Sequence, residues 1–228
     1  MDGAVAIVLA AGLGERMHAE MPKALMPFDG TTIVARALER ALSCPSVASA
    51  VVVAPAGWED PVRTLVEPLG VQTVVTGAAT RQGSVTAALR ALSSESTRVV
   101  CHDAARPLAT ASLFERVLDA LDGWDGVVPV LAMVDTVKRV RDGAIERTEP
   151  RETLAVAQTP QAFLASALLA AHERAARDGF EATDDALLLE RAGFRVRAID
   201  GERTNLKITT PEDVRLAEAL ASPTGSRS

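Results

Sequence analysis

The sequence is poor in several features that define large protein classes. It has two cysteines, Cys44 and Cys101, in no C-x-x-C arrangement, which predicts two reduced, buried thiols rather than a disulfide or a metal site. No apolar run approaches the roughly 18 residues of a membrane span. No basic segment precedes the first apolar run, so no signal peptide is indicated and we expect a cytoplasmic protein. The formal net charge of −6 disfavours a general binder of nucleic acid or of a membrane surface.

What the sequence does have is the composition of an ordinary globular chain. Of its 228 residues, 48% are hydrophobic and 24% are charged, which argues against disorder. This length is enough for one domain with a sizeable core. We expect a single domain over residues 1–220, followed by a frayed tail at 221–228.

Apolar, β-branched runs alternate with helical patterns through the first 131 residues. The runs that predict strands lie at residues 4–10, 49–54, 71–75, 98–101 and 126–130. The helical patterns lie at residues 32–42, 59–69, 84–92 and 112–121. This alternation predicts a Rossmann-like α/β fold, with a mostly parallel sheet and helices on both faces. Strands that are hydrophobic throughout favour the same arrangement.

The alternation stops at residues 136–148, where polar and β-branched residues surround Asp142 and Gly143, a strong hairpin signal. The stretch is too polar for a central pair of strands. We therefore predict a hairpin arm at about residues 135–150 that leaves the sheet and makes a dimer contact. Beyond the arm, helices are expected at residues 164–177 and 186–192, a strand at 194–199, and a last helix from Pro211 with Thr210 as its cap.

Two glycines, Gly12 and Gly14, follow the first strand. A dinucleotide fingerprint needs a third glycine where this chain has Met17. A P-loop needs Gly-Lys-Ser/Thr where this chain has Gly-Glu-Arg-Met. The remaining interpretation is a glycine loop whose N–H groups approach an anion, with Arg16 and Lys23 as nearby cations for a polyphosphate. Spacing alone leaves open a plain tight turn with two solvated cations.

The segment HDAARP, residues 102–107, follows the strand at 98–101. Ligands of open α/β sheets collect beyond the carboxyl ends of the strands. Asp103 suits Mg²⁺, which takes one or two carboxylates plus phosphate oxygens, although a helix cap is an equally good interpretation of this residue. We expect His102 to be a hydrogen-bonded core residue rather than a base. The pair Asp184 and Asp185 is expected to cap and support a helix.

Seven collinear motifs resemble one family, the 2-C-methyl-D-erythritol 4-phosphate cytidylyltransferases of the non-mevalonate isoprenoid pathway. They are AAGLGERM with the following PK, GSV at 83–85, HDAARP at 102–107, DTVKR at 135–139, QTPQAF at 158–163, TDDA at 183–186 and NLKITTPEDV at 205–214. The resemblance implies transfer of a cytidylyl group from CTP to the polyol phosphate, with release of pyrophosphate. It also implies Mg²⁺ as cofactor and a homodimer formed through the arm.

The resemblance implies a role for each matching residue. The catalytic cations would be Arg16, Lys23, Arg151 and Lys207, and Asp103 would hold Mg²⁺. The nucleotide would lie against Ala10, Ala11, Gly12, Gly14, Ser84 and Ala104. The acceptor would be held by Arg106, Thr136, Arg151 and Thr159, with the arm carrying its residues into the neighbouring subunit's site.

Two stretches depart from the family pattern, and both flank the expected nucleotide site. Ala24 and Leu25 follow Pro-Lys where many members have Gln-Tyr or Gln-Phe, and the loop at residues 76–82 has one glycine where the family often has two. The resemblance leaves a cytidylyltransferase for another polyol phosphate, such as ribitol 5-phosphate, as an alternative. A non-catalytic nucleotide-binding protein is a second alternative, and it would bind CTP without releasing pyrophosphate.

Overall fold

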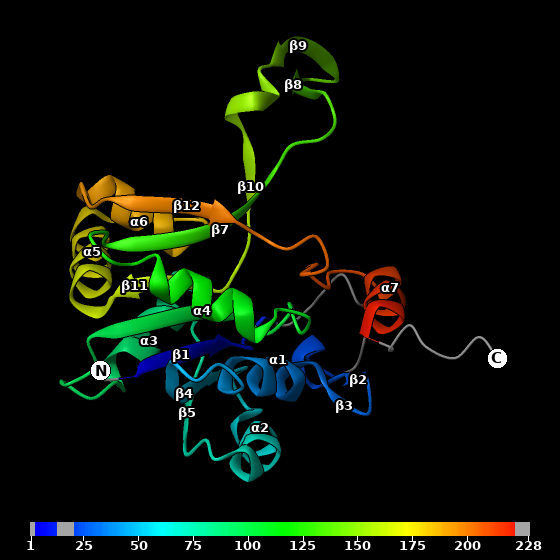
Figure 1. Ribbon diagram of the computed structural model, residues 1–228. Coiled ribbons are helices and arrows are strands. Elements are labelled where there is room, and N and C mark those ends of the chain that lie inside the picture. Colours follow the sequence, from blue (N-terminus) through cyan, green and yellow to red (C-terminus); the bar gives the residue numbers. More distant parts are fainter. Residues whose placement is uncertain (1–2, 13–20, 222–228) are drawn as a thin grey trace.

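The main sheet lies at the centre of three layers (Figure 1). The computed structural model describes residues 3–12 and 21–221. Within them, the sheet has eight strands in the order β10-β7-β11-β6-β1-β4-β5, with β12 paired to β7. The strands are β1 (Ala4–Leu9), β4 (Val47–Ala54), β5 (Thr73–Thr76), β6 (Arg98–Asp103), β7 (Gly126–Ala132), β10 (Ala155–Ala157), β11 (Gln161–Leu164) and β12 (Val196–Asp200). The pairs β1–β4, β1–β6, β4–β5 and β12–β7 are parallel, so the sheet is mixed and mostly parallel, as predicted.

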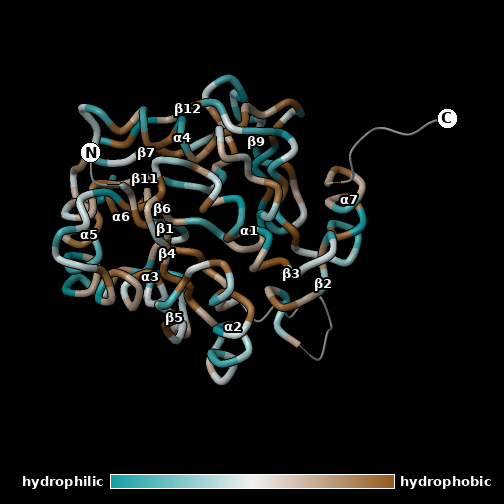
Figure 2. Tube along the Cα trace, turned by 60° about the horizontal axis from the view of Figure 1, so that its bottom comes forward, coloured by the Kyte–Doolittle hydropathy of each residue, from teal (hydrophilic) through white to brown (hydrophobic). Residues whose placement is uncertain are grey.

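Helices cover both faces of this sheet. The helices α1 (Ile33–Leu42), α2 (Glu59–Val66) and α4 (Ala111–Asp119) pack on one face. The helices α3 (Arg81–Arg90), α5 (Ala165–Asp178) and α6 (Asp185–Ala192) pack on the other. In β1, Ala6 and Val8 contribute to the first core and Ile7 to the second, so both faces of the strand are buried. This explains why the strands are hydrophobic throughout. Figure 2 shows apolar stretches running through the middle of the molecule, where the strands lie.

Threonine and aspartate caps determine where several helices begin. The side chains of Thr32, Thr80 and Thr110 accept hydrogen bonds from the N–H three residues on, and Asp184 does the same for α6. The cap at Thr80 starts α3 at Arg81, three residues before the predicted start. The earlier start places Arg81 in the first turn of the helix, beside the carboxyl edge of the sheet.

The antiparallel part of the sheet was not predicted. The strand β11 lies between β6 and β7 and runs antiparallel to both, and β10 pairs antiparallel with β7. Both strands are three or four residues long, too short to show a period in sequence. A small separate pair, β2 (Pro27–Phe28) with β3 (Thr31–Thr32), was also missed.

The C-terminal helix α7 (Pro211–Ala221) packs beside this small pair. Phe28, Ile33, Leu108, Ile208 and Ala217 form a third buried cluster there. The Asp213 carboxylate accepts hydrogen bonds from the backbone N–H groups of Thr209 and Thr210, which fixes the start of the helix. The segment before the helix, residues 203–209, has no regular secondary structure, and its shape depends on side-chain contacts.

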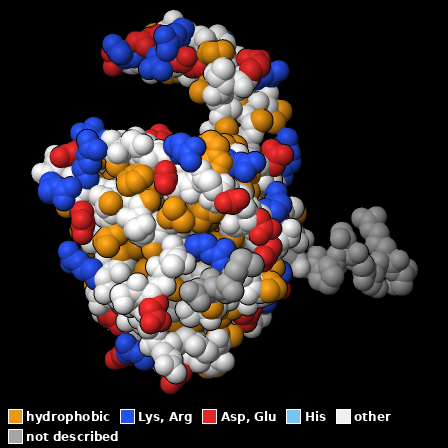
Figure 3. Space-filling model, turned by 60° about the vertical axis from the view of Figure 1, so that its left-hand side comes forward, with side chains coloured by type: hydrophobic (Ala, Val, Ile, Leu, Met, Phe, Trp, Pro, Cys, Tyr) orange, Lys and Arg blue, Asp and Glu red, His pale blue; other side chains and the backbone are white. Residues whose placement is uncertain are grey.

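The predicted hairpin is present and forms a two-stranded sheet of its own, β8 (Val137–Arg141) with β9 (Ala144–Glu149). Asp142 and Gly143 both have positive φ, 48° and 79°, as a tight hairpin turn requires. The arm projects from the body in Figure 1, and charged side chains gather at its end in Figure 3.

Two of the exclusions made from the sequence can be examined in the fold. Cys44 and Cys101 are free and buried, as predicted. Across the described ranges, no helix combines the length and the apolar character that crossing a membrane requires.

Candidate active site

The predicted site residues that follow strands meet at the carboxyl edge of the parallel strands. Ala10 continues β1 and its N–H donates to Val53 O at 2.9 Å, while Ala104 continues β6 and its N–H donates to Leu9 O at 3.0 Å. These bonds place residues 10–12 and 103–105 side by side. Gly12 is exposed there, and among the described residues a Cβ on it would meet nothing within 4 Å. The described residues therefore leave the Gly12 backbone uncovered.

The loop at residues 76–80 packs closely against the first of these segments. A Cβ on Gly77 would collide with the Cβ of Ala11 and lie 3.0 Å from Ala54 O, so only glycine fits. The Ser84 hydroxyl is buried, donates to Thr80 O at 3.0 Å and accepts from the N–H of Ala78 at 3.0 Å. Ser84 therefore shapes the loop beside residues 10–12.

Asp103 ends β6 between two cations. Its Oδ2 accepts from Lys207 Nζ at 2.8 Å, and its Oδ1 lies 3.5 Å from Arg81 Nε. Burial by itself would raise the pKa of the Asp103 carboxyl, but Arg81 and Lys207 overcome this effect and hold the pKa well below its usual range. The site therefore presents an ionised carboxylate whose positive partners come from distant parts of the chain.

Lys23 lies in the short 3-10 turn η2 (Lys23–Leu25), and its Nζ donates to Ile208 O at 2.8 Å. The N–H of Ile208 in turn donates to Ala105 O at 2.8 Å. These two bonds connect Lys23 and the segment that carries Lys207 to the segment that follows Asp103. The fold thus brings together three of the predicted residues, Lys23, Asp103 and Lys207, from three separate motifs.

Thr159 and His102 hold the backbone of Asp103 in place. The N–H of Asp103 donates to Thr159 Oγ1 at 3.0 Å, Thr159 Oγ1 lies 3.1 Å from His102 Nδ1, and His102 Nε2 donates to Arg106 O at 3.1 Å. Burial lowers the pKa of His102 to about 4, so the ring is neutral at physiological pH. A neutral ring protonated on Nε2 satisfies all three hydrogen bonds. His102 is thus a hydrogen-bonded core residue, as predicted, and not an exposed base.

Arg106 is buried on the other side of this chain of hydrogen bonds. Its guanidinium donates from Nη1 to Asn205 O at 2.8 Å and from Nη2 to Ala157 O at 3.4 Å. Gln158 also reaches the same segment, through hydrogen bonds from its Nε2 to Glu202 O and Asn205 O. These contacts give the irregular segment before α7 its course past Asp103.

The two predicted residues of the arm region lie away from this cluster in a single chain. Thr136 and Arg151 are exposed, and Arg151, just after the β8–β9 hairpin, donates from Nη1 to Val134 O, just before it, at 2.6 Å. Gly14 and Arg16, the other two predicted residues of the glycine loop, lie outside the described residues.

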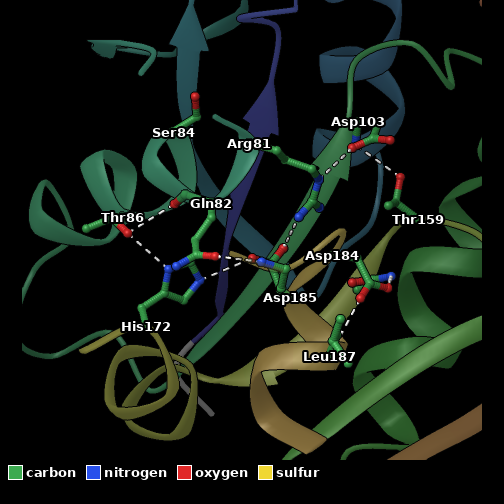
Figure 4. A network of polar contacts seen from close by, with 12 residues as sticks. Arg81, Gln82, Ser84, Thr86, Asp103, Thr159, His172, Asp184, Asp185 and Leu187 are labelled. Atoms are coloured by element: carbon green, nitrogen blue, oxygen red, sulfur yellow. Dashed lines mark hydrogen bonds and ion pairs between the residues drawn. The ribbon is translucent and has the colours of Figure 1, made fainter. Parts of the chain in front are cut away.

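Sequence reasoning missed Arg81. Arg81 bridges Asp103 and the buried Asp185, and His172 lies on the far side of Asp185 (Figure 4). Burial alone would raise the pKa of Asp185, but Arg81 and His172 outweigh it and lower the pKa. Asp184 caps α6 while Asp185 supports this network, as the prediction of a cap-and-support pair stated. The sequence signals that could have pointed to this network were the aspartate pair in TDDA and the arginine in the loop at residues 76–82.

Asp103 could bind Mg²⁺ as one protein ligand among waters and phosphate oxygens. In the described part of the chain, no group of three or more His, Cys, Asp or Glu side chains lies close enough together to hold a metal. A single carboxylate is the donor set of an Mg²⁺ ion that keeps waters and phosphate oxygens as its other ligands. The site thus fits Mg²⁺ that arrives with a phosphate compound and does not fit a resident ion held by protein alone.

Comparisons with known proteins agree on one family. The family model described as IspD, 2-C-methyl-D-erythritol 4-phosphate cytidylyltransferase, matches residues 4–222. A relative of that description from Rhodococcus jostii is 45% identical over 218 residues, covering 95% of this chain and 94% of the relative. Another, from Symbiobacterium thermophilum, is 43% identical over 216 residues, covering 94% and 91%.

Solved structures agree with the sequence relatives. The crystal structure of 2-C-methyl-D-erythritol 4-phosphate cytidylyltransferase from Thermus thermophilus is similar with a TM-score of 0.81 and 38% identity, covering 97% of this chain and 99% of that one. The crystal structure of 4-diphosphocytidyl-2C-methyl-D-erythritol synthase from Anaerococcus prevotii is similar with a TM-score of 0.84 and 30% identity, covering 96% and 98%.

Proposed function

The chain belongs to the 2-C-methyl-D-erythritol 4-phosphate cytidylyltransferase family, and we propose that the cluster around Asp103 is where it carries out that family's reaction. The enzyme transfers a cytidylyl group from CTP to 2-C-methyl-D-erythritol 4-phosphate and releases pyrophosphate. The sequence motifs alone left ribitol 5-phosphate open as acceptor. The family model and the relatives that cover most of the chain name the methylerythritol compound.

One observation carries the assignment of the site. Lys23, Asp103 and Lys207 come from three different family motifs, and the fold brings them together at the carboxyl edge of β6. The acceptor phosphate is already an anion, so attack on the α-phosphorus of CTP needs no nucleophilic side chain. It needs alignment of two anionic reactants and stabilisation of the charge that develops between them. A set of cations at a strand edge supplies both.

Within this proposal the cations have separate tasks. Lys23, with Arg16, holds the triphosphate and stabilises the developing charge, and Lys207 reaches the α-phosphate. Asp103 holds Mg²⁺, which would arrive with CTP and neutralise phosphate charge. The ion pair between Lys207 and Asp103 supports this assignment, because the lysine side chain is 44% exposed and can exchange partners when a phosphate enters.

The nucleotide is proposed to lie along residues 10–12 and the loop beside them. The exposed backbone at Gly12 and the close packing of Gly77 on Ala11 leave main-chain groups facing the site. Ser84 shapes this wall through Ala78, and Ala104 continues it from β6. Gly14 completes the proposed set.

The acceptor is proposed to bind between this cluster and the arm of a second subunit. Arg106 and Thr159, which lie near Asp103, would contact the acceptor from this subunit, while Thr136 and Arg151 would come from the partner's arm. Apolar side chains exposed on and near the arm support a homodimer: Val134, Val140, Ile145, Leu154 and Val156 are 37–65% exposed. Exposed apolar groups concentrated on one projection are typical of an interface.

The direct test is release of pyrophosphate from CTP and Mg²⁺, run in parallel with 2-C-methyl-D-erythritol 4-phosphate and ribitol 5-phosphate. We expect turnover with the first acceptor and none above background with the second. Reactions without acceptor and reactions of an Asp103→Asn variant serve as controls. Turnover with ribitol 5-phosphate alone would contradict the acceptor, and CTP binding without pyrophosphate release would contradict the enzyme activity itself.

A further inference from the structure

Arg81 joins the carboxylate of the site to a second carboxylate in the core. Its Nε lies 3.5 Å from Asp103 Oδ1, and its Nη1 donates to Asp185 Oδ2 at 2.7 Å. The three residues come from β6, from the first turn of α3 and from the first turn of α6, so they meet only in the folded chain (Figure 4). A planar guanidinium can donate in two directions at once, which an ammonium group on a flexible stem does less well.

Asp185 is a fixed end of this bridge. It is completely buried, and its Oδ1 accepts from His172 Nε2 at 3.1 Å while its Oδ2 accepts from Arg81. His172 is itself buried, and its Nδ1 lies 3.0 Å from Thr86 Oγ1 on α3. Since both oxygens of Asp185 have partners from packed helices, the carboxylate has no freedom to turn. It therefore anchors the guanidinium of Arg81.

The two cations beside Asp103 differ in how firmly they are held. The Lys207 side chain is 44% exposed, extends from a segment without regular structure, and contacts Oδ2. The Arg81 side chain is 25% exposed, starts from a capped helix, and contacts Oδ1 while Asp185 holds its other end. When an anionic ligand with its own cation arrives, Lys207 can leave Asp103 and Arg81 cannot.

We propose that Arg81 is a positioning residue: anchored by Asp185, it keeps Asp103 Oδ1 engaged, so that Oδ2 alone is presented to the metal that accompanies CTP once Lys207 moves to phosphate. This inference rests on the proposed function, in which Asp103 holds Mg²⁺. It adds that the orientation of the metal ligand is set by a chain of buried contacts that reaches α5, outside the nucleotide site.

A purely structural Arg81 would behave differently. It would lower thermal stability when replaced, and the molecules that still fold would keep the metal dependence of the natural chain. A positioning Arg81 would change the metal affinity of correctly folded molecules. The distinguishing quantity is therefore the affinity of the enzyme–CTP complex for a divalent ion, measured alongside the melting temperature.

The experiment uses Arg81→Lys, which keeps the positive charge facing Asp185 and removes the two-way fork. We would titrate the complex of full-length protein and CTP with Mn²⁺ and follow free Mn²⁺ by electron paramagnetic resonance. We expect the dissociation constant of Mn²⁺ to rise by about tenfold or more, the usual effect of losing a partner behind a metal ligand. The affinity for CTP in EDTA should stay within about twofold, because Arg81 acts through the metal ligand.

Arg90→Lys is the matched control, because Arg90 is exposed at the last turn of the same helix. We expect it to leave the Mn²⁺ affinity unchanged. Asp185→Asn is the second variant. It keeps the arginine at position 81 but weakens the contact that anchors its guanidinium, so it should also raise the dissociation constant of Mn²⁺. Restoration of turnover in Arg81→Lys by excess Mg²⁺ would further support positioning.

A lower melting temperature with an unchanged Mn²⁺ affinity in both variants would overturn the proposal. So would a natural chain that shows no Mn²⁺ binding in the presence of CTP. Failure of the proposed activity is distinguishable, because it appears as absent pyrophosphate release in the natural chain, while the Mn²⁺ titration reports on Arg81 without any turnover.

Discussion

The cluster at Asp103 and the arm of β8 and β9 both carry residues proposed to act on the substrates, and they are built in different ways. In the cluster, contacts join residues about a hundred positions apart, as between Asp103 and Lys207. In the arm, the ion pairs join residues of one hairpin, as between Arg139 and Glu149. The cluster is fixed by the packing of the sheet. The arm is held by its own turn, strand pairing and ion pairs, and its apolar side chains Val140 and Ile145 are exposed.

The difference shows how the site divides its tasks. Groups proposed to stabilise charge during the reaction lie at the carboxyl edge of the sheet, next to the packed core, where many contacts resist small displacements. Groups proposed to complete the acceptor site lie on a projection that a second copy would hold in place. We therefore expect changes in the cluster to alter the rate, and changes in the arm to alter assembly and acceptor binding.

The largest expected effect is on kcat, and it should differ between a lysine of the cluster and a lysine of the arm. The chain has three: Lys23 and Lys207 in the cluster and Lys138 in the arm. Lys23→Ala should lower kcat by roughly 10²–10³, the usual effect of removing one preorganised charge-stabilising donor. Lys138→Ala should leave kcat within about twofold, because among the described residues Lys138 Nζ donates to the exposed Thr148 across the hairpin and to no group of the cluster. Steady-state kinetics with CTP decides, and a loss under about threefold for Lys23→Ala would remove its assigned role.

The second effect tests how tightly the cluster is tied to the core. His102 takes up a proton only near pH 4 in the folded chain, whereas an unfolded histidine does so near pH 6.5. The unfolded chain binds more protons between these values, so the free energy of unfolding should fall as pH decreases across this window. The loss attributable to His102 is about 3 kcal/mol, from a shift of about 2.5 pK units.

Urea unfolding between pH 7 and pH 4.5 measures this loss. The buried carboxylates Asp103 and Asp185 have lowered pKa values, so their contributions are lost only below about pH 4 and lie outside the range. In His102→Gln the decline across the range should be distinctly smaller than in the natural chain. If the free energy of unfolding fell equally with pH in both proteins, protonation of His102 would not be the cause of the loss of stability.

A third experiment examines the arm as an interface. Val140 and Ile145 face each other across the hairpin and are 59% and 65% exposed. Ile145→Asp should weaken dimerisation by roughly 10–100-fold, because a charge would be buried without a partner. Sedimentation equilibrium measures the change, and the KM for the acceptor should rise with the fraction of monomer. A natural chain that sediments as a fully active monomer would contradict the proposed role of the arm.

The smallest expected effect concerns the ion pairs of the arm. Arg141 Nε lies 2.8 Å from Glu146 Oε1, and the arginine side chain is 73% exposed. Exposed pairs of this kind contribute about 0–1 kcal/mol, so Arg141→Ala should leave the free energy of unfolding nearly unchanged. Thermal melting at low and high salt checks this. A large, salt-sensitive loss would show that the arm depends on its own charges for its shape.

The positions of the parallel strands and the hairpin could be read from the sequence, because each depends on a local pattern. Residues 4–10 and 126–130 are continuous apolar runs. Asp142 with Gly143 is a residue pair typical of a tight hairpin turn in which both residues have positive φ. The strand β11 could not be read, because four residues after Pro160 show no period, and their place between β6 and β7 is set by neighbours far away in sequence.

The residues of the candidate site also differ in whether a local sequence pattern could identify them. Lys23, Asp103 and Lys207 were found because they stand in family motifs, and Asp103 also because it follows a strand. Arg81 was missed because an arginine in a polar loop has a solvated surface position as its default. Its importance comes from Asp103 and Asp185, which lie 22 and 104 positions away.

By itself the sequence determined the layered α/β fold, the arm, the family and most of the residues proposed to meet the substrates, since periodicity, turn chemistry and collinear motifs are local properties of the chain. The tertiary structure alone decided which of these groups touch one another. It placed β11 in the sheet, enclosed His102 as a neutral ring, and connected Asp103 through Arg81 to the buried Asp185. Charge and burial depend on neighbours in space, and these contacts exist only once the sheet has closed around them.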